Sequence, residues 1–165
     1  MGAGKSSLGR RLAARLDVPF RDADTEIETA AGCSINEIFA RFGEPAFRAG
    51  ERKVIARLLG LPPHVLATGG GAFADAETRE RIKADTVSVW INVPLEILIE
   101  RVGRRDTRPM LKDGDPAEIM TRLFKEREPL YAQADLTINS EDLPHKSAVE
   151  NTLNLLRERG LLEEA

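Results

Sequence analysis

The chain has 165 residues, of which 42% are hydrophobic and 31% are charged, and this balance fits one compact domain. Its net charge of −3 excludes a strongly basic nucleic-acid-binding protein, but it does not exclude a local basic pocket for an anion. The single cysteine, Cys33, excludes a disulfide framework and a cysteine-rich zinc site. No apolar run is long enough to span a bilayer, and the amino terminus lacks a signal-peptide pattern. We therefore expect a soluble cytoplasmic protein.

The predicted elements alternate between helix and strand. Periodic apolar residues indicate the helices, and short apolar runs bounded by turn residues indicate the strands. In chain order we expect a helix over residues 6–17, a strand over 18–20, a helix that breaks at 32, helices over 34–42 and 45–61, a strand over 65–68, a helix over 75–83, a strand over 86–93, a helix over 95–102, a mobile loop over 103–115, a helix over 116–132, a strand over 136–139 and a helix over 146–159. This alternation predicts an α/β three-layer sandwich with a central, mostly parallel sheet.

A phosphate-binding loop is the first functional signal. The segment Gly2-Ala3-Gly4-Lys5-Ser6-Ser7 opens the first helix, and its Gly-Lys-Ser matches the end of the pattern G-x-x-x-x-G-K-[ST]. The glycines let backbone N–H groups converge on a polyphosphate at the helix N-terminus. We expect Lys5 to span the β- and γ-phosphates and the Ser6 hydroxyl to hold Mg²⁺. The alternative is a glycine-rich start before an ordinary helix.

The loop pattern is incomplete, because its first glycine and the strand that feeds such loops are apparently missing from this chain. The loss of the buried side chains of a central strand would cost on the order of 10 kcal/mol. A whole domain has a stability of only roughly 5–15 kcal/mol. We therefore hypothesise that Met1 is not the natural start and that the working protein carries a further strand before it. The intact mass of the protein from its native source tests this hypothesis.

Two aspartates follow the first predicted strand. Asp22 and Asp24 point to the same side if the segment is extended. One could then support Mg²⁺ through water, while the other accepts a hydrogen bond from a substrate hydroxyl and orients or deprotonates it. The alternative is helix capping, because an aspartate just before Thr25 is a good N-cap.

An arginine and a glycine run suggest recognition of a carboxylate. Arg48 and Glu51 have the i, i+3 spacing of one helical face, so Arg48 could grip a substrate carboxylate while Glu51 steadies it. A surface ion pair is the alternative. Gly69, Gly70 and Gly71 follow a buried strand, and three glycines suit a backbone that lies flush against a ligand.

Basic residues also gather late in the chain. Arg104, Arg105 and Arg108 lie in the predicted loop over 103–115, which could close over a nucleotide and neutralise transition-state charge. Arg127 lies late in a helix and could be a second carboxylate clamp. Both could instead be ordinary solvated charges.

Together these motifs resemble those of the shikimate kinase family, within the nucleoside-monophosphate-kinase-like branch of P-loop proteins. They occur in the family's order over essentially the whole chain. The matching segments are Gly2–Ser7, Asp22-Ala23-Asp24, Phe47-Arg48, Gly69-Gly70-Gly71, Thr107-Arg108-Pro109 and Arg127-Glu128-Pro129-Leu130-Tyr131.

The resemblance implies transfer of the ATP γ-phosphoryl group to the 3-hydroxyl of shikimate, with Mg²⁺, in aromatic amino-acid biosynthesis. It implies a single P-loop kinase domain over residues 1–165 with a five-stranded parallel sheet. A shikimate-binding region would cover about 24–52 and a lid about 103–115. It also implies a monomer that binds neither nucleic acid nor membrane.

Residue roles follow from the same match. Catalysis would use Lys5, Asp24 and Arg108. Shikimate would be bound by Asp24, Arg48, Gly69, Gly70, Gly71 and Arg127, with both arginines on its carboxylate. The nucleotide would be bound by Gly2, Ala3, Gly4, Lys5, Ser6, Ser7, Arg101, Arg108 and Pro144, and the metal by Ser6 with Asp22 in support.

Two rival functions compete with this interpretation. A related kinase could act on another hydroxy acid such as gluconate, which a substrate panel would reveal. A kinase-like scaffold that binds shikimate without turnover is the other rival, because the phosphate loop is incomplete.

Overall fold

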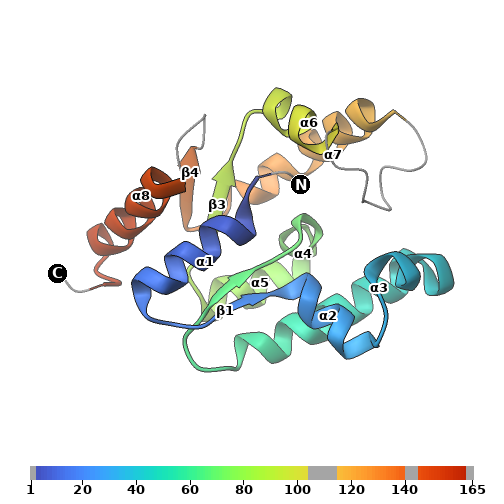
Figure 1. The fold of residues 1–165 in the computed structure, drawn as a ribbon, viewed down its shortest axis with the longest axis horizontal. Coiled ribbons are helices and arrows are strands. Elements are labelled where there is room, and N and C mark those ends of the chain that lie inside the picture. The colour runs from blue at the N-terminus through green and yellow to red at the C-terminus, as the bar shows by residue number, and fades with distance from the viewer. Residues whose placement is uncertain (1–2, 104–114, 140–144, 163–165) are drawn as a thin grey trace.

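The computed structural model describes residues 3–103, 115–139 and 145–162. Helices and strands alternate along the chain as the sequence predicts (Figure 1). In order they are α1 (Lys5–Leu16), β1 (Phe20–Asp22), α2 (Ala23–Ala31), α3 (Ile35–Leu59), β2 (Val65–Ala67), α4 (Gly70–Ala74), α5 (Ala76–Asp85), β3 (Val89–Asn92), α6 (Leu95–Gly103), α7 (Pro116–Tyr131), β4 (Leu136–Asn139) and α8 (His145–Glu158). No helix in these described ranges is long and apolar enough to cross a membrane.

The strands form two parallel pairs. β1 pairs with β2, with Phe20 opposite Val65, and β3 pairs with β4, with Val89 opposite Leu136. Within the described ranges these pairs are separate two-stranded sheets, whereas the family resemblance implies one five-stranded sheet. The parallel direction of both pairs agrees with the predicted α/β class.

Helices cover both faces of the strands. Val65 packs with residues of α1 and α8, whereas its neighbour Leu66 packs against residues of α3. Successive side chains of a strand point to opposite faces, so α1 and α8 form one outer layer and α3 the other. Figure 1 shows α1 beside α8, and α3 along the opposite side of the β1–β2 pair. The three-layer prediction is confirmed.

Local signals set the helix ends in the first half of the chain. Gly32 has a positive φ of 67° and ends α2, and the Ser34 side chain and Glu37 form a reciprocal capping box at the start of α3. The two helices predicted over 34–42 and 45–61 are merged in α3, which kinks at Gly43, where φ is 76°. The kink falls between the two predicted helices, which agrees with that prediction, whereas the short helix α4 was not predicted.

Two strand predictions need correction. β1 lies two residues later than the predicted 18–20, because the backbone stays extended as far as Asp22 and pairs with β2 there. β3 is also shorter than the predicted 86–93, because Thr86 caps the end of α5 and only residues 89–92 align with β4.

Candidate active site

The phosphate-loop residues lie at the start of α1. Gly4 is the N-cap residue, with φ 76° in the left-handed region that glycine tolerates. No side chain caps this helix, and its first turn holds no acidic residue. The N-cap residue therefore offers no side-chain acceptor to the first N–H groups of the helix, and the helix dipole favours a negative charge there. Ala3, Lys5, Ser6 and Ser7 are all partly buried, and Gly2 lies outside the described residues.

The two residues predicted to place the metal are in contact. The Ser6 hydroxyl donates a hydrogen bond of 2.8 Å to Asp22 Oδ2, which joins α1 to the end of β1. The other oxygen, Asp22 Oδ1, accepts from the backbone N–H of Asp24 over 3.1 Å and so caps α2. One carboxylate thus connects the phosphate-loop helix to the helix that carries Asp24.

This arrangement corrects the expectation for the aspartates. The chain is not extended through Asp24, because α2 already begins at Ala23. The capping role that we considered for Asp24 belongs to Asp22. Asp24 instead lies partly buried in the first turn of α2.

Ser6 and Asp22 fit a magnesium site by their chemistry. A hydroxyl and a carboxylate offer the oxygen ligands that Mg²⁺ prefers, and this ion usually keeps several waters and needs few protein ligands. The described ranges hold no group of three or more His, Cys, Asp or Glu that could ligate a metal. A magnesium ion bound here would therefore have few protein ligands, and nucleotide phosphates would supply others.

Arg48 is held by two carboxylates on its own helix. Its Nη1 donates to Glu51 Oε2 over 2.7 Å, and its Nε and Nη2 each donate to Glu44 Oε1 over 3.1 Å. Burial alone would lower the pKa of Arg48, but hydrogen bonds and charges from Glu51 and Glu44 raise it overall. The guanidinium is therefore charged and fixed in orientation, as carboxylate recognition requires.

Glu51 is a buried carboxylate with only 2% of its surface exposed. Its burial raises its pKa; the hydrogen bond and charge of Arg48 oppose this rise, and the charges of Asp24 and Asp75 add to it. The charged form of Glu51 depends strongly on Arg48, because a buried charge without a partner is costly. Of the two interpretations of the Arg48–Glu51 spacing, the structure excludes an ordinary exposed ion pair.

The three glycines lie at the centre of the predicted acceptor residues. A Cβ on Gly69 would lie 3.4 Å from Asp24 Oδ1, and one on Gly70 would lie 3.2 Å from Arg127 Nη1. A Cβ on Gly71 would overlap the Arg48 guanidinium. The glycines therefore allow side chains from α2, α3 and α7 to reach one short backbone segment. Contact of this backbone with a ligand stays a prediction.

The remaining predicted residues are spread over other elements. Arg101 is partly buried in the last turn of α6. Arg108 and Pro144 lie outside the described residues, as does almost all of the predicted lid over 103–115. Sequence reasoning did not single out Glu44 or Tyr131. The i, i+4 spacings of Glu44 with Arg48 and of Arg127 with Tyr131 are the signals that could have identified them.

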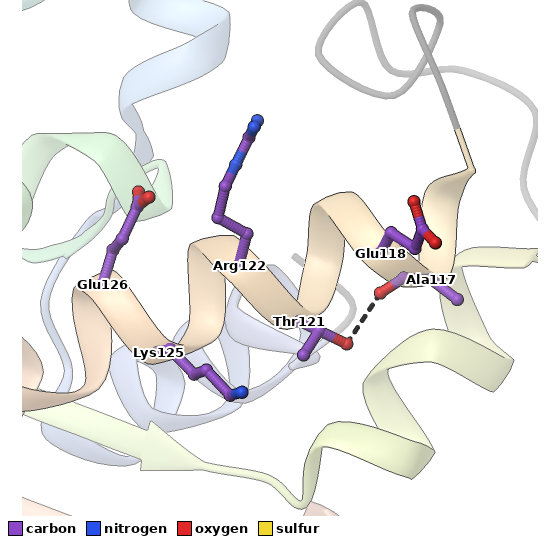
Figure 2. A pocket seen from close by; sticks show the side chains of 6 residues that line it. All are labelled: Ala117, Glu118, Thr121, Arg122, Lys125 and Glu126. Atoms are coloured by element: carbon purple, nitrogen blue, oxygen red, sulfur yellow. Dashed lines mark hydrogen bonds between the residues drawn. The ribbon is translucent and has the colours of Figure 1, made fainter.

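A surface pocket lies apart from this cluster. Figure 2 shows that it follows one side of α7, where the Thr121 hydroxyl donates to the Ala117 carbonyl over 2.8 Å. Its lining residues are Ala117, Glu118, Thr121, Arg122, Lys125 and Glu126. None of them is a predicted site residue. We therefore place no substrate there.

The fold is a parallel α/β sandwich, and its first helix begins at a Gly-Lys-Ser segment without a side-chain cap. Two arginines and a carboxylate meet at the three glycines. These features together are typical of an ATP-dependent small-molecule kinase of the P-loop type. The family model for shikimate kinase matches residues 1–157. The chain belongs to the shikimate kinase family.

Individual relatives agree with this assignment. The chain is 58% identical to the shikimate kinase of Caulobacter vibrioides over 96% of this chain and 79% of that one. It is 63% identical to the shikimate kinase of Paramagnetospirillum magneticum over 86% and 73% of the two chains. Its structure is similar to that of shikimate kinase from Acinetobacter baumannii in complex with shikimate. The TM-score is 0.93 at 37% sequence identity, covering 98% of this chain and 91% of that one.

Proposed function

We propose that this chain transfers the γ-phosphoryl group of ATP to the 3-hydroxyl of shikimate. Asp24, Arg48 and Arg127 would bind the acceptor together with the Gly69–Gly71 backbone. Lys5 would act on the transferring phosphoryl group. The proposal also includes the domain layout expected from the sequence, with acceptor residues over about 24–52 and a lid over about 103–115.

The convergence at the triple glycine carries the proposal. Arg48 abuts Gly71, Arg127 abuts Gly70, and Asp24 abuts Gly69. Two guanidinium groups complement a carboxylate, and an acidic group beside them complements a hydroxyl. Shikimate, a small ring that carries one carboxylate and three hydroxyls, offers this combination of groups.

The transfer step needs little covalent chemistry from the protein. The acceptor oxygen forms a bond to the γ-phosphorus as the bond from that phosphorus to the β–γ bridging oxygen breaks, which leaves ADP. The acceptor hydroxyl gives up its proton, and Asp24 would orient this hydroxyl or take the proton. Lys5 at the start of α1 would offset the charge that moves with the phosphoryl group.

Magnesium belongs to the proposal through Ser6 and Asp22. When bound, Mg²⁺ neutralises phosphate charge and orients the polyphosphate. The 2.8 Å hydrogen bond between Ser6 and Asp22 supports this assignment, because it places a hydroxyl and a carboxylate together beside the uncapped start of α1.

A coupled ADP-release assay tests the function. We expect ADP release from Mg-ATP that depends on shikimate, with far weaker responses to gluconate and to the methyl ester of shikimate. The ester keeps every hydroxyl but lacks the negative charge that the two arginines would bind. Equal rates with shikimate and its ester would contradict recognition of the carboxylate.

The same assay separates the rival functions. Preference for gluconate would favour a kinase for another hydroxy acid. Shikimate binding in calorimetry without ADP release would favour a scaffold that binds but does not transfer. The monomeric state and the cytoplasmic location stay predictions, which sedimentation and cell fractionation can test.

A further inference from the structure

One hydrogen bond ties the end of α7 to the triple glycine. The Tyr131 hydroxyl donates to the Gly70 carbonyl oxygen over 2.6 Å, a short contact between residues 61 positions apart. Tyr131 is the last residue of α7 and Gly70 is the first residue of α4. This tyrosine is the only one in the chain, and it has no role in the mechanism derived above.

The bond acts at the point where both arginines meet the backbone. Arg127 and Tyr131 lie one helical turn apart on the same face of α7. A Cβ on Gly70 would lie 2.6 Å from the Tyr131 hydroxyl and 3.2 Å from Arg127 Nη1. The next residue, Gly71, abuts the Arg48 guanidinium. Tyr131 therefore fixes the backbone segment that both arginines touch.

The surroundings of the phenol suit it as a donor. Burial raises the pKa of Tyr131 above its usual value of 10, although Arg127 and Arg48 oppose this rise. The hydroxyl therefore keeps its proton near neutral pH. The Tyr131 ring also lies beside the ring of Trp90 in β3, with 6.1 Å between the two ring centroids.

We propose that Tyr131 is a positioning residue for acceptor binding, which holds the Gly70–Gly71 peptide and Arg127 in the arrangement that receives the acceptor carboxylate. Without its hydroxyl the Gly70 carbonyl loses the donor that ties α4 to α7, and the glycines have no side chains that would keep the segment in place. This inference rests on the proposed function.

The variant Tyr131→Phe removes the donor and keeps the ring beside Trp90. We expect the KM for shikimate to rise about three- to tenfold, as the loss of one hydrogen bond predicts. The kcat at saturating shikimate, the KM for ATP and the melting temperature should stay close to those of the parent protein. A similar loss in all four quantities would overturn the proposal, because it would indicate general structural damage.

Thr121→Val is a matched control on the same helix. It removes a hydroxyl that donates to a carbonyl over 2.8 Å, but this bond lies within α7 and away from the glycines. We expect no change in the KM for shikimate. An equal rise in both variants would overturn the proposal, because it would show that any loosening of α7 has this effect.

The methyl ester of shikimate tests whether Tyr131 acts through the acceptor charge. Dissociation constants for shikimate and its ester can be followed with Trp90, the only tryptophan, or by calorimetry. Tyr131→Phe should raise the dissociation constant for shikimate about three- to tenfold, and that for the ester by less than about twofold. Equal weakening of both would overturn the role at the carboxylate.

Failure of the proposed function has a different signature. If the parent protein binds no shikimate, the function and the role of Tyr131 fall together. If the parent binds and phosphorylates shikimate, and Tyr131→Phe has the same KM and dissociation constant for shikimate as the parent, only the proposed role of Tyr131 is wrong.

Discussion

Arg48 and Glu51 form an ion pair of 2.7 Å in which the carboxylate is almost completely buried and the arginine side chain keeps 20% of its surface exposed. Solvent therefore reaches Arg48 but hardly reaches Glu51. Two carboxylates hold Arg48, and a Cβ on Gly71 would overlap its guanidinium. Arg48 is therefore a charged group of fixed orientation beside Gly71, which suits it to bind an anion there.

The variant Arg48→Lys tests whether the fork geometry matters. A lysine keeps the positive charge but loses the planar pair of donors that matches a carboxylate. We expect the KM for shikimate to rise about tenfold or more, with the KM for ATP nearly unchanged. Arg81→Lys is the control, because Arg81 forms an exposed 3.2 Å ion pair with Glu77 on α5. Equal losses for shikimate and ATP would contradict carboxylate recognition.

Burial of Glu51 predicts an unusual pH dependence of stability. Burial raises its folded-state pKa above the unfolded value, so the folded protein binds more protons in the window between the two values. The contribution of Glu51 to the free energy of unfolding therefore falls as pH rises from about 4.5 through the folded pKa. Groups that face it are Arg48, Asp24 and Asp75.

Denaturant unfolding of the parent protein and of Glu51→Gln across this window checks the sign. The parent should lose stability relative to the variant as pH rises, because glutamine cannot titrate. A parent that gains stability relative to the variant over the same window would contradict a raised pKa.

The overlap at Gly71 predicts that one methyl group is enough to disturb the site. In Gly71→Ala the new Cβ would meet the Arg48 guanidinium, which Glu51 and Glu44 hold in place. We expect the KM for shikimate to rise about tenfold as Arg48 is displaced. The melting temperature is the companion measurement, because alanine in a helix otherwise favours stability.

Gly50→Ala is the matched control for this variant. Gly50 also lies in a helix, and a Cβ there would meet no atom within 4 Å. We expect a gain of about 0.5–1 kcal/mol in the free energy of unfolding and unchanged kinetics. A similar rise in KM from both alanines would show that helix stiffening, and not the displacement of Arg48, causes the effect.

The sequence predicted the positions of helices and strands better than the point at which one element passes into the next. Apolar periodicity and capping residues located α1 and α7 closely, and β4 to the residue, because such signals are local. The start of α2 was left open by contrast. Whether Asp22 or Asp24 caps the helix depends on how far β1 pairs with β2, which is a long-range interaction.

In the candidate site, too, local contacts were predictable from the sequence and long-range ones were not. The i, i+3 spacing of Arg48 and Glu51 predicted their contact, but not that Glu51 is buried. Burial depends on the packing of α2 and α3 around the triple glycine. The bond from Tyr131 to Gly70 joins residues 61 positions apart, and no periodicity within α7 identifies a backbone partner on α4.

The double role of Asp22 predicts two separable effects of Asp22→Ala. Loss of the α2 cap should lower the free energy of unfolding by about 1 kcal/mol. Loss of the Ser6 partner should also raise the Mg²⁺ concentration needed for half-maximal activity. Ser34→Ala serves as the control, because it removes the cap of α3 away from α1. An unchanged Mg²⁺ requirement in Asp22→Ala would show that Asp22 caps α2 and has no role in binding the metal.

Lys5 at the start of α1 predicts a split between chemistry and acceptor binding. Lys5→Met keeps most of the length of the side chain and removes its charge, so the positive field on the transferring phosphoryl group weakens. We expect kcat to fall about 10²-fold or more, as for other losses of a group that stabilises transition-state charge. The dissociation constant for shikimate should change little, because Arg48, Arg127 and Asp24 meet at the glycines on other elements. Lys125→Met on the exposed side of α7 controls for the loss of one positive charge. Parent-like turnover by Lys5→Met would rule out a role for this lysine in phosphoryl transfer.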